Sequence, residues 1–328
     1  MKVFVTGSSG FIGTHLVREL AAAGHQVTGL DIQPPIEALP PGAQFVQIDL
    51  LDRQALTTAL QSASPAALVH LAARTDVEET KRIEWYAANI EGVSNLISAV
   101  RATPSIGRAI YTSTQLVCRL GHTPRHPEDY CPNTLYGESK VETERRVRAG
   151  DGGGVTWCLV RPTTIWGPGM NPKYLAFFRL IASGRYFHIG AAPLRKSYGY
   201  IGNTVHQYVR LLEVPPDRIH RRLFYLADYE PLSIRQWAES LRQRMQAPAI
   251  RTIPIPLALA GAAAGSVAWT LGLRSVPLTL YRLRNMRTEY LYDLSDTERT
   301  LGPLPCAFGA AVDETVEWLR RMDIAAAG

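Results

Sequence analysis

The chain has 328 residues, a formal net charge of +6 and 46% hydrophobic residues, enough apolar content for one large unit or two cooperating domains. Its lysines and arginines are spread along the sequence, which argues against a nucleic-acid partner. Its four cysteines form no C-x-x-C pair, so we expect neither a metal centre nor a redox motif.

A short apolar strand, residues 3–5, opens the chain and leaves no room for a signal peptide, so we expect a cytoplasmic protein. Three glycines with the spacing G-x-x-G-x-x-G follow this strand, and an amphipathic helical pattern comes next. The turn contains Gly7, Gly10 and Gly13, with Phe11 and Ile12 between the last two. Strand, glycine turn and helix form the context that a dinucleotide-binding loop requires.

A second strand, residues 26–30, ends in Asp31. An acid about 20 residues after a glycine turn can accept both hydroxyls of an adenosine ribose. The glycines alone would fit a tight turn without any ligand. Together with the strand, the helix and the acid, they predict a site for NAD.

Strands and helices then alternate along the chain. Strands are predicted at 44–48, 67–71, 108–111 and 155–160, and helices at 52–60, 77–101 and 133–150. This alternation is typical of an α/β fold with a doubly wound parallel sheet and helices on both faces. Ligands bind such sheets at the carboxyl ends of the strands.

After residue 166 the alternation weakens. Helical patterns at 174–183, 203–212, 233–245 and 313–322 are broken by proline and glycine, and the strand at 223–226 indicates a return to the main sheet. We therefore expect a Rossmann domain that binds NAD, formed by residues 1–165 with 198–228. Residues 166–197 and 229–328 are expected to form a smaller, mostly helical substrate-binding lobe.

Residues 253–273 carry no charge and are long enough to cross a bilayer. Two prolines and several small residues make this segment only modestly hydrophobic. We expect a buried or surface-lying helix, and contact with a membrane is the alternative.

Tyr136 and Lys140 share one face of the helix predicted at 133–150. A nearby ammonium stabilises a phenolate and lowers the pKa of a tyrosine. The hydroxyls of Ser113 and Thr114 follow a strand about twenty residues earlier. A hydroxyl, a tyrosine and a lysine in this order predict hydride transfer at a carbon that bears a hydroxyl or carbonyl oxygen.

Nearly the whole chain resembles the extended short-chain dehydrogenases/reductases of the NAD-dependent epimerase/dehydratase family. The motifs that carry the resemblance are Thr6-Gly7-x-x-Gly10-x-x-Gly13, Asp31, Asp49-Leu50, His70-Leu71-Ala72-Ala73, Asn89-x-x-Gly92, Ser113-Thr114, Tyr136-x-x-x-Lys140, Arg161-Pro162 and Trp166-Gly167-Pro168-Gly169.

The resemblance implies a role for each matching position. It implies that NAD is bound by Gly7, Gly10, Phe11, Ile12, Gly13, Asp31, Asp49, Leu50, Leu71, Ala72, Ala73, Asn89, Tyr136, Lys140 and Pro162. It implies that Tyr136 is the acid/base and Lys140 its partner, with Thr114 preferred over Ser113 as the assisting hydroxyl. The implied substrate-binding residues are Thr75, Thr164, Arg195 and Lys196. On the sequence alone, an exposed helical position remains an equal alternative for Asn89, and solvated surface charge remains one for Arg195 and Lys196.

Gln115 and Leu116 stand where related 4,6-dehydratases carry Asp-Glu, which argues against elimination of water. The resemblance therefore favours an NAD-dependent nucleotide-sugar epimerase acting at C4. The alternative is a reductase or dehydrogenase of a nucleotide keto sugar or a hydroxysteroid-like alcohol. A non-catalytic NAD sensor is disfavoured, because all three catalytic side chains are present. The resemblance also implies a homodimer formed by the helix at 85–101 and the helix of Tyr136.

Overall fold

The computed structural model describes residues 1–77, 82–273 and 278–324. Contacts divide the chain into two compact units. Unit 1 contains Met1–Trp166, Gly199–Tyr229 and Tyr292–Pro305, and unit 2 contains Gly167–Tyr198, Glu230–Leu291 and Cys306–Gly328.

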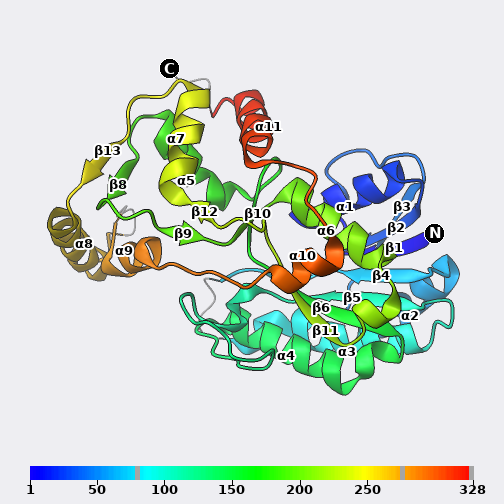
Figure 1. The fold of residues 1–328 in the computed structure, drawn as a ribbon. Helices are drawn as coiled ribbons and strands as arrows, with labels where there is room; N and C mark the ends of the chain where they lie inside the picture. Colours follow the sequence, from blue (N-terminus) through cyan, green and yellow to red (C-terminus); the bar gives the residue numbers. More distant parts are fainter. Residues whose placement is uncertain (78–81, 274–277, 325–328) are drawn as a thin grey trace. The chain divides into compact units, whose positions relative to one another are not determined.

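Unit 1 contains a seven-stranded parallel sheet (Figure 1). Its strands are β1 (Lys2–Thr6), β2 (Gln26–Asp31), β3 (Ala43–Gln47), β4 (Ala67–His70), β5 (Arg108–Thr112), β6 (Thr156–Pro162) and β11 (Arg222–Leu226). They lie in the order β11-β6-β5-β4-β1-β2-β3, and every neighbouring pair is parallel. The chain changes direction across the sheet between β1 and β4, the point at which ligands bind in this fold class. The predicted doubly wound parallel sheet is confirmed, including the late return of β11.

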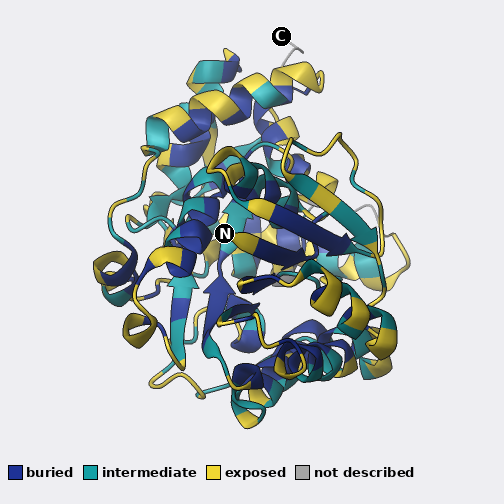
Figure 2. Ribbon diagram, turned by 90° about the vertical axis from the view of Figure 1, so that its right-hand side faces the viewer, coloured by how far each residue is buried: buried dark blue, intermediate teal, exposed yellow. Residues whose placement is uncertain are grey.

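Helices cover both faces of this sheet (Figure 1). The helices of unit 1 are α1 (Phe11–Ala22), α2 (Arg53–Ala63), α3 (Ala87–Arg101), α4 (Leu135–Ala149), α6 (Ile201–Glu213) and α10 (Ser295–Leu301). Helix α1 packs beside α6 on one face, and α3 lies between α2 and α4 on the other. Because both faces are covered, the strands of the sheet are mostly buried (Figure 2). In β1, Val3, Phe4 and Val5 are at most 1% exposed.

One helix start and one domain assignment differ from the prediction in the part of the chain that carries the site. The helix predicted at 77–101 begins at Ala87, after a 3₁₀ turn η1 (Ile83–Tyr86), and residues 78–81 of that prediction lie outside the described residues. Residues 292–305, which we assigned to the smaller lobe, belong to unit 1. Thr297 of α10 bonds the backbone oxygen of Tyr225 in β11, and the ring of Tyr292 stacks on Tyr225 at 4.3 Å.

Unit 2 is mostly helical. Its helices are α5 (Leu175–Ala182), α7 (Ile234–Met245), α8 (Ile255–Thr270), α9 (Leu280–Arg287) and α11 (Phe308–Arg321). Two small ribbons accompany them: β8 (Phe187–Ile189) with β13 (Arg251–Ile253), and β9 (Arg195–Lys196) with β12 (Leu232–Ser233). The remaining pair, β7 (Thr164–Trp166) with β10 (Tyr198–Tyr200), belongs to unit 1 apart from Tyr198. Among the described helices, none is long and apolar enough to cross a membrane.

Candidate active site

The glycine turn between β1 and α1 is closed by backbone contacts. Gly7 has φ +75, and its N–H donates to the oxygen of Leu30 at 2.7 Å. A Cβ on Gly7 would lie 2.5 Å from the nitrogen of Ala72, and one on Gly13 would lie 2.0 Å from the oxygen of Gly7. Gly10 is the N-cap of α1 and supplies no side-chain cap, which leaves the first-turn N–H groups available to a phosphate. The turn therefore fits the pyrophosphate of a dinucleotide.

Asp31, at the end of β2, is held beside this turn. Its Oδ2 accepts from the backbone nitrogen of Ser9 at 3.1 Å, and its Oδ1 accepts from that of Gln33 at the same distance. These bonds orient the carboxylate without neutralising its charge. A negative group fixed here suits a ribose with two free hydroxyls and disfavours a 2′-phosphate.

Two further sets of predicted cofactor residues lie at the carboxyl edge of the sheet. Asp49 is exposed, and its Oδ1 accepts from the nitrogen of Leu51 at 2.9 Å. Leu50 is buried against α3, and a Cβ added to Gly92 of that helix would lie 2.9 Å from the Cβ of Leu50. The residues that follow β4 and line this edge, all half-buried, are Leu71, Ala72 and Ala73.

Asn89, expected from the resemblance to contact the cofactor, is bonded within the protein. Its side chain is fully buried, and its amide nitrogen donates to the oxygen of Arg74 at 3.0 Å and to Ser139 Oγ at 2.9 Å. Its amide oxygen accepts from the nitrogen of Arg74 at 2.8 Å. Both amide hydrogens are therefore used within the protein. Asn89 thus fastens the loop after β4 to α4.

Helix α4 carries both Tyr136 and Lys140. Thr134 caps it, because its Oγ1 accepts from the nitrogen of Gly137 at 3.0 Å. The buried Lys140 donates from Nζ to the backbone oxygen of Thr112 at 2.6 Å, which fixes it at the end of β5. Burial lowers the pKa of Lys140 to about 8, although the charge of Glu144 acts in the opposite direction. The Tyr136 side chain is also buried, with its ring 6.2 Å from that of Tyr86.

The structure distinguishes the two candidate hydroxyls. Ser113 Oγ donates to Glu144 Oε1 at 2.6 Å, so its only proton is engaged inside the protein. Thr114 Oγ1 accepts from the nitrogen of Leu116 at 3.3 Å. That contact uses a lone pair and leaves the hydroxyl proton of Thr114 for a substrate oxygen. Of the two hydroxyls, Thr114 is therefore the one with a proton free of the bonds described here.

A buried ion pair behind the two hydroxyls was not anticipated as a site feature. Glu144 and Arg161 are both fully buried and joined by two bonds of 2.7 and 2.8 Å. Tyr130 donates to Glu144, and Arg161 donates to Tyr225 and to the oxygen of Pro127. The one signal in the sequence is the i, i+4 spacing of Lys140 and Glu144, which puts both on the same face of α4. This network, with every charge bonded, holds Ser113 and hence the strand end that bears Thr114.

The predicted substrate residues are divided between the two units. In unit 1, Thr75 is exposed in the loop after β4, and Thr164 in β7 accepts from Gln115 Nε2 at 3.2 Å. Pro162, predicted at the cofactor, is buried at the end of β6. Arg195 and Lys196 belong to unit 2.

Of the two predicted cations, only Arg195 is exposed. Lys196 is buried; its Nζ donates to the oxygen of Asn285 at 3.0 Å and lies over the ring of Tyr290 at 5.1 Å. Burial lowers the pKa of Lys196 to about 8. Lys196 thus serves to attach β9 to α9, and Arg195 remains the candidate for a substrate phosphate.

We expected no metal centre, yet the fold gathers three possible ligands. Among the described residues, ligand atoms of Cys118, His122 and Cys131 lie within 4.8 Å of one another. Cys118 Sγ donates to the oxygen of Asp129 at 3.1 Å, and His122 Nε2 lies 3.3 Å from its carboxylate. Sequence spacing could not reveal this cluster, because its members come from the two arms of one loop. The cluster joins the arms that lead away from Thr114 and toward Tyr136.

A Rossmann sheet with a glycine turn, a ribose-facing acid and a Tyr-Lys helix defines a dinucleotide-dependent enzyme. The chain belongs to the NAD dependent epimerase/dehydratase family, which it matches over residues 3–224. It is thus an enzyme, and its cofactor is NAD.

The individual relatives are named for two kinds of activity, dehydrogenation of a steroid alcohol and epimerisation of a sugar. A 3 beta-hydroxysteroid dehydrogenase/Delta 5-->4-isomerase of Mycobacterium tuberculosis is 27% identical, covering 77% of this chain and 74% of the relative. An N-acetyl-alpha-D-glucosaminyl-diphospho-ditrans,octacis-undecaprenol 4-epimerase of Escherichia coli O157:H7 is 25% identical, covering 97% and 95%. The structure of UDP-glucuronic acid 4-epimerase from Bacillus cereus with UDP-glucuronic acid and NAD matches with a TM-score of 0.74 at 21% identity, covering 98% of this chain and all of that one. This last likeness supports the fold.

Proposed function

We propose that the protein uses NAD to oxidise a secondary alcohol carbon, with Thr114, Tyr136 and Lys140 as the catalytic residues. The observation that carries this proposal is Lys140, buried on the Tyr136 helix and bonded at 2.6 Å to the end of β5, two residues before Thr114. Burying a cation there lowers its pKa, and catalysis offers a reason for retaining it.

Each side chain has a distinct task in this mechanism. NAD, when bound, supplies the hydride acceptor, and the fit of the glycine turn and Asp31 assigns its phosphates and adenosine ribose to unit 1. Tyr136 takes the hydroxyl proton of the substrate at its phenol oxygen and returns it later. Lys140 stabilises the phenolate through its charge. Thr114 donates a hydrogen bond to the same substrate oxygen.

For the substrate we propose a nucleotide sugar, inverted at C4 through a transient keto sugar. The undecaprenol-linked 4-epimerase relative, which aligns over nearly the full chain, supports inversion at C4 of a sugar that carries a diphosphate. Gln115 and Leu116 after Thr114 supply no acid pair for elimination. In this scheme unit 1 binds NAD and unit 2 binds the sugar nucleotide. Arg195 of unit 2 is an exposed cation for the substrate phosphates.

A second candidate is a dehydrogenase or reductase of a nucleotide keto sugar or a hydroxysteroid-like apolar alcohol. The steroid dehydrogenase relative favours this candidate. The bonding of buried Lys196 to Asn285 favours it too, because Lys196 is then not accessible to a substrate phosphate. An apolar substrate would need no phosphate-binding pair.

Redox balance decides between the two. The purified protein is incubated with a nucleotide sugar in heavy water, without added NAD. Interconversion of two stereoisomers without NADH accumulation or solvent deuterium at the inverted carbon is the outcome expected of the epimerase. A product that requires stoichiometric NAD or NADH, formed from a sugar or a steroid alcohol, would establish the second candidate instead.

We also propose that the protein is a cytoplasmic homodimer formed through α3 and α4. Trp85 beside α3 is 42% exposed, which supports a contact there, and Arg74 covers part of its ring at 3.5 Å. Ile90 of α3 is half-buried. Light scattering at micromolar concentration should give the mass of two chains, and a monomer would contradict the proposal.

A further inference from the structure

Helix α8 is apolar on every side but mostly exposed. Its sixteen residues include no charged side chain, and only Ala258, Ala262 and Gly265 are buried. Ala258 and Ala262 pack with Leu283 of α9, while Leu257 and Val267 remain 63% and 59% exposed. A helix that is hydrophobic all round is normally enclosed by protein or by lipid. Nothing in unit 2 encloses this one within the described residues.

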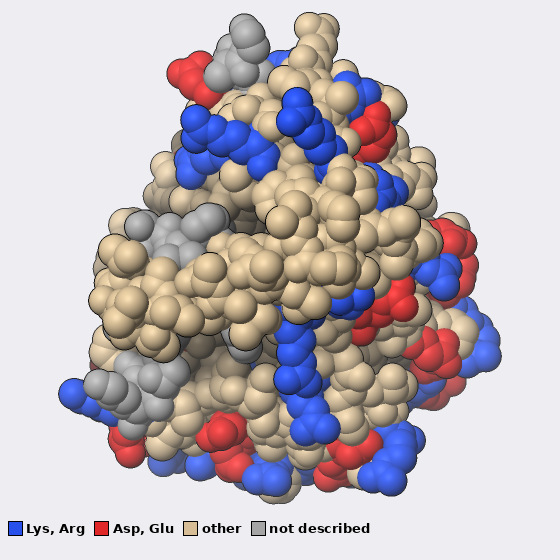
Figure 3. Space-filling model, turned by 90° about the vertical axis from the view of Figure 1, so that its left-hand side faces the viewer, with Lys and Arg blue, Asp and Glu red and all other residues tan. Residues whose placement is uncertain are grey.

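The exposed apolar side chains continue beyond α8. Leu271 and Leu273 follow it, and Leu280 and Met286 on α9 are exposed as well. Single exposed leucines are ordinary, but a concentration on two packed helices marks an interaction site. Figure 3 shows the face on which α8 lies, with a broad band that carries neither acidic nor basic side chains, and with charged side chains of both signs at its margins.

Helix α9 adds positive charge to this apolar surface. It contains Arg282, Arg284 and Arg287 and no acid. In the part of the chain that the structure describes, the guanidinium groups of Arg284 and Arg287 have no hydrogen-bond or ion-pair partner. Glu289, the next acid in the sequence, accepts from the backbone nitrogen of Arg195 at 2.8 Å.

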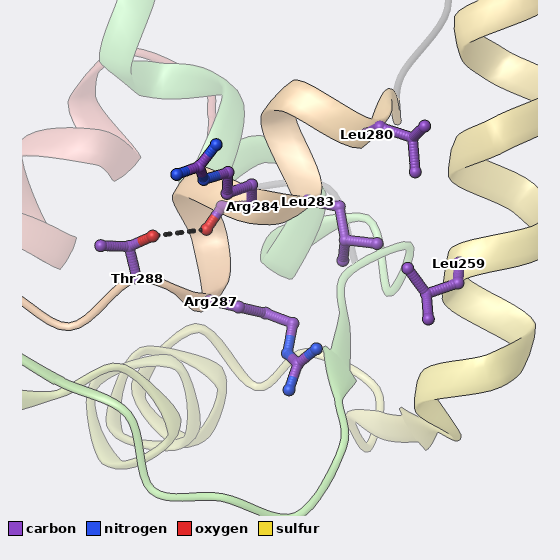
Figure 4. A pocket seen from close by; sticks show the side chains of 6 residues that line it. All are labelled: Leu259, Leu280, Leu283, Arg284, Arg287 and Thr288. Atoms are coloured by element: carbon purple, nitrogen blue, oxygen red, sulfur yellow. Dashed lines mark hydrogen bonds between the residues drawn. The ribbon is translucent and has the colours of Figure 1, made fainter. Parts of the chain in front are cut away.

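Apolar and basic groups meet in one cavity between the two helices. The cavity has a volume of about 320 Å³ and is lined by Leu259 of α8, by Leu280, Leu283, Arg284 and Arg287 of α9, and by Thr288 (Figure 4). Leucines on one side and unpaired guanidinium groups on the other match an acyl chain that ends in a phosphate.

We propose that the surface formed by α8 and α9, here called the α8–α9 surface, binds an anionic lipid bilayer. The apolar side chains of α8 enter the boundary between headgroups and acyl chains, and Arg284 and Arg287 bind lipid phosphates. Spanning a bilayer takes about 20 apolar residues, more than the sixteen of α8, so the helix lies in the plane of the interface. A second copy of the same surface is disfavoured, because two copies would bring like-charged arginines together.

Vesicle binding of the full-length protein tests this proposal. The protein should sediment with vesicles of phosphatidylcholine and phosphatidylglycerol but much less with phosphatidylcholine alone, and added salt should weaken the binding. The variants Arg284→Ala and Arg287→Ala should each lower the partition coefficient about fivefold, the equivalent of one basic residue at an anionic surface. The matched control Arg321→Ala, an exposed position on α11, should bind like the unaltered protein.

The apolar contribution is tested by Leu257→Asp, which should abolish sedimentation, against Leu180→Asp on α5 as the control. Trp269 in α8 provides an independent readout. Brominated lipid should quench its fluorescence, and that quenching should disappear in Trp269→Phe. Absence of binding to anionic vesicles, or equal binding by Leu257→Asp, would overturn the proposal. So would a concentration-dependent dimer that Leu257→Asp converts to a monomer, since the surface would then be covered by a second copy. These readouts are independent of the proposed reaction.

Discussion

Helices α4 and α8 invert the usual relation between polarity and burial. Of the fifteen residues of α4, seven are charged and eight are buried, among them Lys140 and Glu144. Of the sixteen residues of α8, none is charged and only three are buried. In α4 the buried charges are all bonded, to Thr112, Arg161 and Ser113. In α8, no described residue covers the exposed apolar side chains. Polar groups are retained inside a fold where chemistry needs them, and apolar groups are retained outside where a partner covers them.

The sharpest test of the first half of this contrast is Tyr136→Phe. The ring and its packing remain, but the proton carrier is lost, so turnover should fall by roughly 10²–10⁴ while NAD binding persists. Steady-state kinetics and a cofactor titration measure the two effects. Tyr174→Phe, at an exposed tyrosine, should retain normal turnover. Near-normal turnover in Tyr136→Phe would remove Tyr136 from the mechanism.

Breaking the ion pair between Glu144 and Arg161 should show how much this buried pair contributes to the stability of the fold around α4. Glu144→Gln leaves the buried Arg161 charge without a counter-charge, which should lower the free energy of unfolding by about 3–5 kcal/mol in urea titrations. Glu142→Gln removes an exposed partner of Arg145 and should change it by about 0–1 kcal/mol. Equal losses of unfolding free energy in the two variants would mean that the buried pair stabilises the protein no more than the exposed pair does.

The two neighbouring hydroxyls should separate catalysis from stability. Thr114→Val removes a donor to the substrate oxygen and should lower kcat by about 10². Ser113→Ala removes a bond to Glu144 and should lower the free energy of unfolding by about 1.5–3 kcal/mol while most of the turnover remains. The opposite assignment of the two effects would make Ser113 the catalytic hydroxyl.

The pH profile should report the buried lysine. Because burial lowers the pKa of Lys140 to about 8, its ammonium is present below that pH and is lost as pH rises through it. We expect kcat/KM to decline on the alkaline side near that value. Lys140→Arg keeps the charge and should move the decline to higher pH. Lys196→Arg should leave the decline where it is, although burial lowers the pKa of Lys196 similarly. An alkaline limb that Lys140→Arg does not move would belong to another group.

The smallest effect is expected on α8. Leu257 contributes little to the core, so Leu257→Asp should change the free energy of unfolding by less than about 0.5 kcal/mol. Urea titration in the absence of lipid measures it. A large loss would show that α8 is held by the protein itself, and the contrast with α4 would then fail.

The sheet and the glycine turn were predictable because their causes are local. Apolar runs, the Gly7-Gly10-Gly13 spacing and the capping residue Asp52 each act within a few residues. The partners of Glu144 and Asn89 were not predictable. Arg161 reaches Glu144, and Ser139 reaches Asn89, only when separate elements pack against one another. The same holds for Lys196, whose acceptor lies 89 residues away. Local chemistry indicated which residues matter, and tertiary contacts decided which of them can touch a ligand.

The late return of β11 has a consequence for the order in which the protein folds during synthesis. Strand β6 ends at Pro162, and its outer neighbour β11 does not begin until Arg222. Until the ribosome has added that stretch, β6 presents an unpaired edge, and Arg161 lacks its bond to Tyr225. Open strand edges recruit other chains. A nascent chain stalled within this interval is therefore at its most aggregation-prone, and we expect a fragment ending at residue 220 to precipitate where one ending at residue 230 remains in solution.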